Sequence, residues 1–101
     1  MGNKNYEKGR RFEYERAAHY RAKGCEVMRT AGSHGLFDLV VITARGQVEL
    51  VQCKVTQDEA TADRLIEAFR ASPPLGHKYH ADYHQVLEVK VLNKGIRDTV
   101  V

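Results

Sequence analysis

The chain has 101 residues and a formal net charge of +3. A chain of this length can bury a hydrophobic core without disulfide bonds to hold it together, so we expect a single domain over residues 1–101. No apolar run approaches the roughly 18 residues that a membrane-spanning helix needs, and the N-terminus is polar, with no apolar segment to act as a signal peptide. These features predict a cytoplasmic protein that neither enters a membrane nor leaves the cell.

A helix is predicted first, from about residue 6 to residue 23, and Gly24 ends it. Basic residues concentrate in the first third of the chain: Lys4, Lys8, Arg10, Arg11, Arg16, Arg21, Lys23 and Arg29. Such a concentration of positive charge is typical of a surface that faces nucleic-acid phosphates. A solvated helix face explains the same charges equally well, because Glu7, Glu13 and Glu15 are interspersed among them.

One acidic residue of this helix, Glu13, is placed where a helix is expected to pack. At helical spacing it shares a stripe with Tyr6, Ala17 and Tyr20. Acids are rarely left on a packing face without a partner. Glu13 is therefore either a carboxylate at the edge of the stripe, reaching solvent or an arginine, or part of a functional site.

Three strands are predicted next, over residues 26–30, 37–43 and 47–55, joined by the segments AGSHGL and ARG. The second strand, FDLVVIT, is apolar on both faces, which is typical of a central, buried strand. It nonetheless opens with Asp38. A turn residue or a cap is the ordinary explanation for such an aspartate, and a functional site is the other.

The third strand, VELVQCKV, carries two polar side chains where a buried strand would continue its apolar run. Alternate side chains share a face of a strand, so Gln52 and Lys54 project side by side from one end of it. If the second and third strands form a hairpin through ARG, Asp38 lies toward the same end, because positions 38 and 52 are about equidistant from the turn. One site can then hold all three side chains together with Glu13.

The second half of the chain completes a mixed sheet. A helix is predicted over residues 58–71, a loop over residues 72–83, a strand over residues 85–92 and a short terminal strand after the turn NKG. The helix has an apolar stripe at helical spacing, formed by Ala62, Leu65, Ile66 and Phe69. The order α-β-β-β-α-β-β predicts an α/β (α+β) fold in which helices flank a mixed β-sheet.

The ordered motifs of residues 6–56 resemble the archaeal-type Holliday-junction resolvases of the PD-(D/E)xK nuclease superfamily. Those enzymes have a lysine–glycine pair and a glutamate four residues after the glycine, as Lys8, Gly9 and Glu13 are arranged here. An arginine with a following alanine, glycine and serine comes next, then a metal-binding aspartate and a motif that ends in lysine. The matching residues are Arg29, Ala31, Gly32, Ser33, Asp38, Gln52 and Lys54. The resemblance implies a restriction-endonuclease-like fold, and the second half of the chain matches only in element order.

The resemblance also implies Mg²⁺-dependent hydrolysis of a DNA phosphodiester, with Mn²⁺ able to substitute and no small-molecule cofactor. The implied catalytic residues are Glu13, Asp38, Gln52 and Lys54. The implied metal ligands are Glu13, Asp38, Gln52 and the backbone carbonyl of Cys53. Lys54 would orient or deprotonate the attacking water, and Arg29 would clamp a phosphate. The implied DNA-binding residues are Lys8, Arg10, Arg11, Arg29, Ser33 and His34.

A four-way junction has two-fold symmetry, and cutting two of its strands symmetrically requires two active sites. The resemblance therefore implies a homodimer whose two-fold axis places both sites on one basic surface, with branched DNA as the partner.

Gln52 departs from the family pattern, because resolvases of this group usually have glutamate at this position. A neutral amide oxygen binds a hard cation more weakly than a carboxylate does. Glutamine does occur here in modification-dependent restriction endonucleases. Three functions stay open: a junction resolvase, a restriction-type endonuclease that cuts other DNA substrates, and a non-catalytic DNA-binding protein on the same fold.

Overall fold

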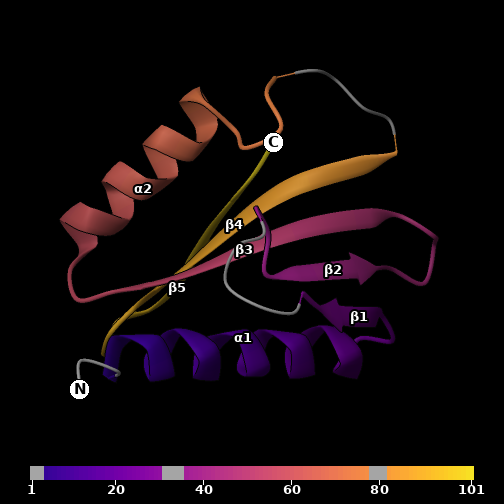
Figure 1. The fold of residues 1–101 in the computed structure, drawn as a ribbon, viewed down its shortest axis with the longest axis horizontal. Helices are drawn as coiled ribbons and strands as arrows, with labels where there is room; N and C mark the ends of the chain where they lie inside the picture. The colour runs from indigo at the N-terminus through magenta and orange to yellow at the C-terminus, as the bar shows by residue number, and fades with distance from the viewer. Residues whose placement is uncertain (1–3, 31–35, 78–81) are drawn as a thin grey trace.

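A five-stranded sheet with one helix on each face forms the body of the molecule (Figure 1). The computed structural model describes residues 4–30, 36–77 and 82–101, with side chains from residue 7 onward. The elements are α1 (Lys4–Ala22), β1 (Glu26–Arg29), β2 (Leu39–Ile42), β3 (Val48–Thr56), α2 (Glu59–Ala71), β4 (Tyr83–Val91) and β5 (Gly95–Val100). Their order confirms the α-β-β-β-α-β-β prediction. Within the described residues, neither helix combines the length and the apolar character needed to cross a membrane.

The strands lie in the order β1-β2-β3-β4-β5, and only the central pair, β3 and β4, is parallel. Parallel neighbours cannot be joined by a tight turn, so α2 serves as the crossover between them. The hairpin of β2 and β3 pairs Leu39 with Val51 at its open end. This register is the one that equal distances from the turn predict, and it ends one residue before Asp38, whose N–H donates to the carbonyl of Val51 at 2.8 Å.

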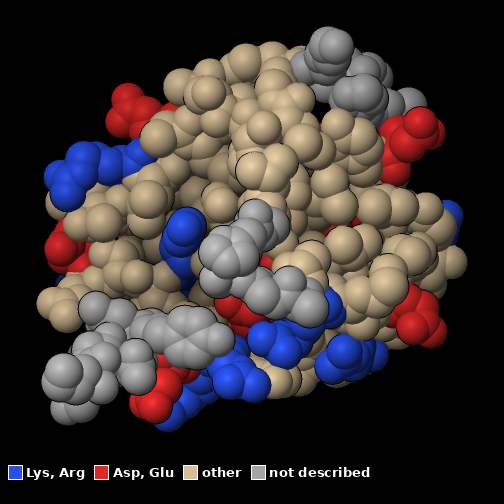
Figure 2. Space-filling model, viewed as in Figure 1, with Lys and Arg blue, Asp and Glu red and all other residues tan. Residues whose placement is uncertain are grey.

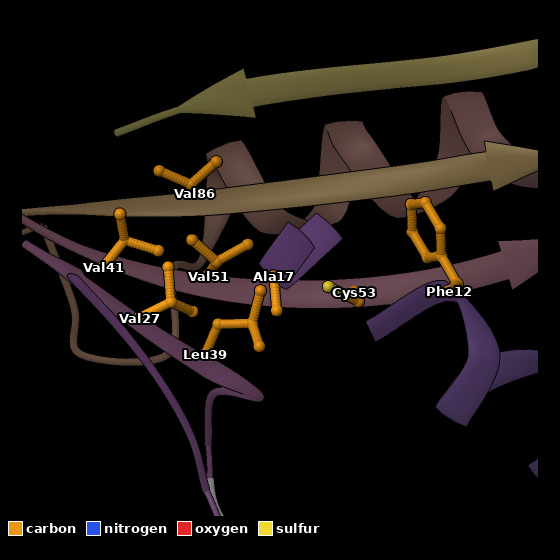
Figure 3. Close-up of a cluster of buried hydrophobic side chains, with 8 residues drawn as sticks. All are labelled: Phe12, Ala17, Val27, Leu39, Val41, Val51, Cys53 and Val86. Carbon is orange, nitrogen blue, oxygen red and sulfur yellow. The ribbon is translucent and has the colours of Figure 1, made fainter. Parts of the chain in front are cut away.

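The helix α1 covers one face of the sheet, which we call the α1 side. Phe12 and Ala17 are fully buried there, and Gly24 ends the helix turn with a positive φ of 88°. The residues of the sheet that complete this core are Val27, Leu39, Val41, Val51, Cys53 and Val86. Figure 3 shows the branched side chains of the strands gathered near Ala17, with Phe12 further along β3.

The helix α2 covers the opposite face, the α2 side. Asp58 caps its N-terminus, because the carboxylate accepts a hydrogen bond from the backbone N–H of Thr61 at 2.7 Å. The predicted apolar stripe packs inward as expected. It meets Phe37 and three residues of β4, namely Leu87, Val89 and Val91.

The strand predicted over residues 37–43 begins two residues later, at Leu39. Phe37 packs on the α2 side, whereas Leu39 packs on the α1 side. Two residues of one regular strand would share a face, so the chain must change direction between them. The backbone bends at Asp38, which places this aspartate where the chain passes from one side of the sheet to the other.

Candidate active site

Glu13 and Asp38 lie within electrostatic range of each other where α1 meets the sheet. The Arg29 side chain, at the end of β1, donates a hydrogen bond from Nη2 to Oε1 of Glu13 at 3.3 Å. The Glu13 side chain is only 22% exposed. Burial, followed by the negative charge of Asp38, raises the pKa of Glu13 above its ordinary value, although Arg29 acts in the opposite direction. The two carboxylates are therefore close enough to repel each other.

The Asp38 side chain is fixed by the neighbouring strand β3. Its Oδ2 accepts a hydrogen bond from the backbone N–H of Cys53 at 2.8 Å, and its own N–H donates to the carbonyl of Val51 at 2.8 Å. On the other side, its carbonyl accepts from the backbone of Thr30 at 3.0 Å. Among the described residues, no hydrogen bond to its other carboxylate oxygen, Oδ1, is formed.

The Cys53 thiol is not suited to hold a metal ion. Burial, followed by the negative charges of Glu88 and Asp38, raises the pKa of this thiol well above its usual range. A thiol must lose its proton to become a good metal ligand. The Cys53 side chain packs in the core of the α1 side, and the backbone carbonyl of Cys53 as a metal ligand stays a prediction.

Gln52 and Lys54 share one face of β3, as the alternation predicted. With Leu65, Phe69 and Leu87 they line a pocket of about 200 Å³ beneath α2. The Gln52 amide donates from Nε2 to the carbonyl of Leu36 at 3.3 Å, and within the described part of the chain its Oε1 accepts no hydrogen bond. Lys54 is exposed, and among the described residues no hydrogen bond or ion pair holds its ammonium group.

The contacts thus connect the predicted site residues in two pairs. Glu13 is linked to Asp38 through electrostatics alone, with Arg29 bonded to Glu13, and Gln52 and Lys54 line one pocket. Within the part of the chain that the structure describes, no group of three or more His, Cys, Asp and Glu side chains is arranged to hold a metal ion. The convergence of all four side chains on one ion stays a prediction.

The predicted DNA-binding residues of α1, namely Lys8, Arg10 and Arg11, are all exposed. Figure 2 shows Lys and Arg side chains along the lower part of the molecule, over α1 and β1, with acidic atoms among them. The predicted contacts of Ser33 and His34 lie outside the described residues.

Tyr14, which the sequence patterns did not single out, lies beside this site. The guanidinium carbon of Arg29 is 4.0 Å from the centroid of its ring, and that of Arg10 is 5.8 Å away. The Arg10 hydrogen bond and then the charge of Arg29 lower the pKa of Tyr14. Arg10 and Tyr14 are four residues apart on a helix, so the i, i+4 spacing was a signal that could have identified the pair.

A second missed group is a buried network under α1. Glu88, on β4, is 1% exposed and accepts hydrogen bonds from Arg16 Nε at 2.8 Å and Nη2 at 3.1 Å, and from the Tyr20 hydroxyl at 2.6 Å. An acidic residue inside the apolar run VLEVKV is the same kind of irregularity as Asp38. It indicates a buried partner, and the i, i+4 pair Arg16 and Tyr20 supplies it.

The donors at the site fit a hard divalent cation. Carboxylate, amide and carbonyl oxygens are the ligands that Mg²⁺ prefers in proteins. Burial and then the charge of Asp38 raise the pKa of Glu13, and a bound cation would relieve both by compensating the negative charge.

Comparisons with known proteins place these observations in a family. The model of the archaeal Holliday junction resolvase (Hjc) family matches residues 4–101. The fold is similar to that of Hjc, a Holliday junction resolvase from the archaeal hyperthermophile Archaeoglobus fulgidus, with a TM-score of 0.58 and 18% identity over 90% of this chain and 70% of that chain. No curated protein sequence matches the chain significantly. The chain belongs to the archaeal Holliday junction resolvase family, within the PD-(D/E)xK nuclease superfamily.

Proposed function

We propose that this chain is a Mg²⁺-dependent endonuclease that resolves four-way DNA junctions by phosphodiester hydrolysis. Family membership supports the substrate class. The observation that carries the chemistry is the pair of carboxylates, Glu13 and Asp38, held next to Arg29. Two acids that repel each other beside an arginine suit a site that takes up a cation and a phosphate together.

The ion would be held by oxygen atoms from three elements. The donors are Oδ1 of Asp38, the Glu13 carboxylate, Oε1 of Gln52 and the carbonyl of Cys53. Mg²⁺, or Mn²⁺ in its place, takes few protein ligands and keeps several waters, so this sparse set is sufficient. When bound, it supplies Lewis-acid stabilisation of the phosphate charge and makes water nucleophilic at neutral pH.

The remaining steps belong to side chains of this protein. The Lys54 ammonium, exposed at the rim of its pocket, would orient the attacking water and screen the charge that develops on the phosphate. Arg29 would hold a phosphate oxygen through guanidinium donors that Glu13 does not use. The hydrogen bond from Cys53 N–H would keep the Asp38 carboxylate in a single orientation during the reaction.

Symmetric cutting of a junction requires two copies of the site, so we propose a homodimer with two-fold symmetry as the active form. Each copy would be a single nuclease domain that places one site on a shared basic surface. A protein that resolves DNA junctions works where the DNA is, so we expect it to act inside the cell.

Gln52 supports a second candidate function, that of a DNA-binding protein that no longer cuts. A neutral amide in place of a carboxylate removes one negative charge from the ion's surroundings. Binding of junction DNA would persist in such a protein, because phosphate contacts do not depend on this residue.

Cutting of defined DNA substrates tests these functions. The protein would be incubated with an end-labelled four-way junction and with linear duplex of the same sequence, in Mg²⁺, Mn²⁺ or EDTA. Paired, symmetric nicks confined to the junction and lost in EDTA are expected. Equal cutting of the duplex would instead indicate a restriction-type endonuclease, and binding without cutting in either metal would indicate the non-catalytic protein.

A matched pair of variants assigns the cutting to this site. Asp38→Asn should lower the cutting rate by about a hundredfold or more while sparing junction binding, because the amide is a poorer ligand for the ion. Asp98→Asn, which makes the same change on an exposed residue of β5, should cut like the wild type. Full activity of Asp38→Asn would remove this aspartate from the site.

A further inference from the structure

Two arginines converge on the ring of Tyr14 at the edge of the active site. Arg29 comes from β1 and Arg10 from α1, and both guanidinium groups lie within cation–π range of the same ring, at 4.0 Å and 5.8 Å. Arg29 is additionally paired with Glu13 at 3.3 Å. The ring of Tyr14 therefore links a helix residue and a strand residue that are 19 positions apart in the chain.

The cluster has donors that its protein partners do not use. Arg29 has one ion pair among the described residues, with Glu13, and its buried Nε has no hydrogen-bond partner within them. Two guanidinium groups are thus gathered around one ring, and Arg29 contributes a donor without a partner among the described residues. Guanidinium donors gathered in one place are suited to bind a phosphate.

We propose that Tyr14 is a positioning residue that holds Arg10 and Arg29 as one subsite for a backbone phosphate of the DNA, next to the phosphate that is cut. This inference rests on the proposed function, because it assigns the subsite to the same substrate. The ring fixes the plane of Arg29, so that its free donors point at the phosphate. The same ring lies 5.8 Å from the guanidinium carbon of Arg10 and holds that group as well.

The exposure of Tyr14 makes the test practicable. Tyr14 is 47% exposed, so replacing its side chain leaves the core intact. Tyr14→Phe keeps the ring and removes the hydroxyl, and Tyr14→Leu removes both. Neither variant changes the net charge of the protein. The urea midpoints of both variants should match that of the wild type.

Junction binding would be measured in EDTA, over a series of salt concentrations. Tyr14→Leu should weaken binding by about tenfold, and Tyr14→Phe by about two- to threefold, because the stacking of Arg29 survives in the second variant. The slope of log Kd against log salt should fall by about one in Tyr14→Leu, although no charge has been removed, because Arg29 no longer holds its phosphate.

A double-mutant cycle separates positioning from an independent contact. In an Arg29→Gln background, Tyr14→Leu should weaken binding by less than about twofold, because the group that it positions is gone. As a control for lost charge, Arg45→Gln changes an exposed arginine in the β2–β3 turn, at the opposite end of the hairpin from Asp38. Its affinity and salt slope should stay close to those of the wild type.

The outcomes distinguish this inference from the proposed function. If the wild type binds but never cuts, while the Tyr14 variants show the expected losses, the subsite stands and the endonuclease proposal fails. If the wild type cuts junctions while Tyr14→Leu binds as tightly as the wild type, or loses affinity equally in both backgrounds, the subsite is overturned. Absence of any binding to DNA would overturn it as well.

Discussion

The two sides of the sheet are built differently. On the α1 side a carboxylate is fully buried with its arginine and tyrosine partners, and a second acid, Glu13, is partly buried beside Asp38. On the α2 side the core is aliphatic and aromatic, and the ion pairs, Asp63 with Arg97 and Glu59 with Lys94, lie at the surface. Glu88 is the one charged residue that is buried among those described. Both sides therefore bury an apolar core, and the α1 side in addition holds charges in place within it.

The buried network of the α1 side helps to position the candidate active site. Arg16, which pairs with Glu88, is three residues after Glu13 on the same helix. Glu88 raises the pKa of Arg16 through their hydrogen bond, and burial raises the pKa of Tyr20 well above its usual range, so both remain protonated donors. A buried ion pair with hydrogen bonds requires defined distances and directions between its partners, whereas an apolar contact does not. The network thereby fixes how α1 lies on β4, and with it where Glu13 meets Asp38.

Removal of the buried carboxylate should have the largest effect on stability. Glu88→Ala leaves Arg16 buried without its counter-charge, and we expect a loss of about 3–5 kcal/mol in the free energy of unfolding. Urea denaturation measures this loss. Glu59→Ala, a matched change of an exposed acid on the α2 side, should cost about 0–1 kcal/mol. Equal losses in the two variants would show that the α1 network does not contribute in this way.

The residue next to Glu88 tests the other side of the sheet. Val89 is fully buried against α2, so Val89→Ala removes apolar contacts and should cost about 2 kcal/mol. At temperatures where this variant remains folded, its cutting of junctions should equal that of the wild type. A loss of cutting in folded Val89→Ala would contradict the inference that the α1 side, and not the α2 side, positions the charged groups of the candidate active site.

The Gln52→Glu variant tests whether Gln52 is one of the donors around the proposed metal ion. A carboxylate adds a negative charge to the donors, so the Mg²⁺ concentration for half-maximal cutting should fall by about tenfold. A metal titration of the cutting rate measures the change. Glu67→Gln, on the exposed face of α2, serves as a control for the general effect of an altered charge. An unchanged Mg²⁺ requirement in Gln52→Glu would place Gln52 outside the ion's surroundings.

The raised pKa of Glu13 predicts a smaller, pH-dependent effect. Because the folded protein raises this pKa from its ordinary value of 4.5, the unfolded chain gives up the proton first as the pH rises. The wild type should therefore lose stability, relative to Glu13→Gln, from about pH 4.5 up through the raised pKa, and the difference should then level off. Urea denaturation of both proteins across this range measures it. Parallel pH profiles would contradict the shift.

The regular part of the fold could be predicted because local periodicity determines it. The apolar stripe of α2, the shared face of Gln52 and Lys54 and the register of the β2–β3 hairpin all follow from repeats of 3.6 and 2 residues or from the distance to a turn. Helix α1 was less well predicted, since Phe12 is fully buried there while Glu13 lies at the edge of the buried face. The sequence of α1 is so polar that its apolar stripe is weak, and the stripe did not determine which face of the helix packs on the sheet.

The sequence alone determined where polar residues interrupt apolar patterns, at Asp38 and at Gln52 and Lys54, and that the last two share one face of β3. Only the tertiary structure decided that Glu13 approaches Asp38, that the chain bends at Asp38, and that Arg29 stacks on Tyr14. The physical reason is that a periodic pattern describes directions within one element. The distance between side chains of different elements depends on how helix and sheet pack together, and that packing involves the whole core.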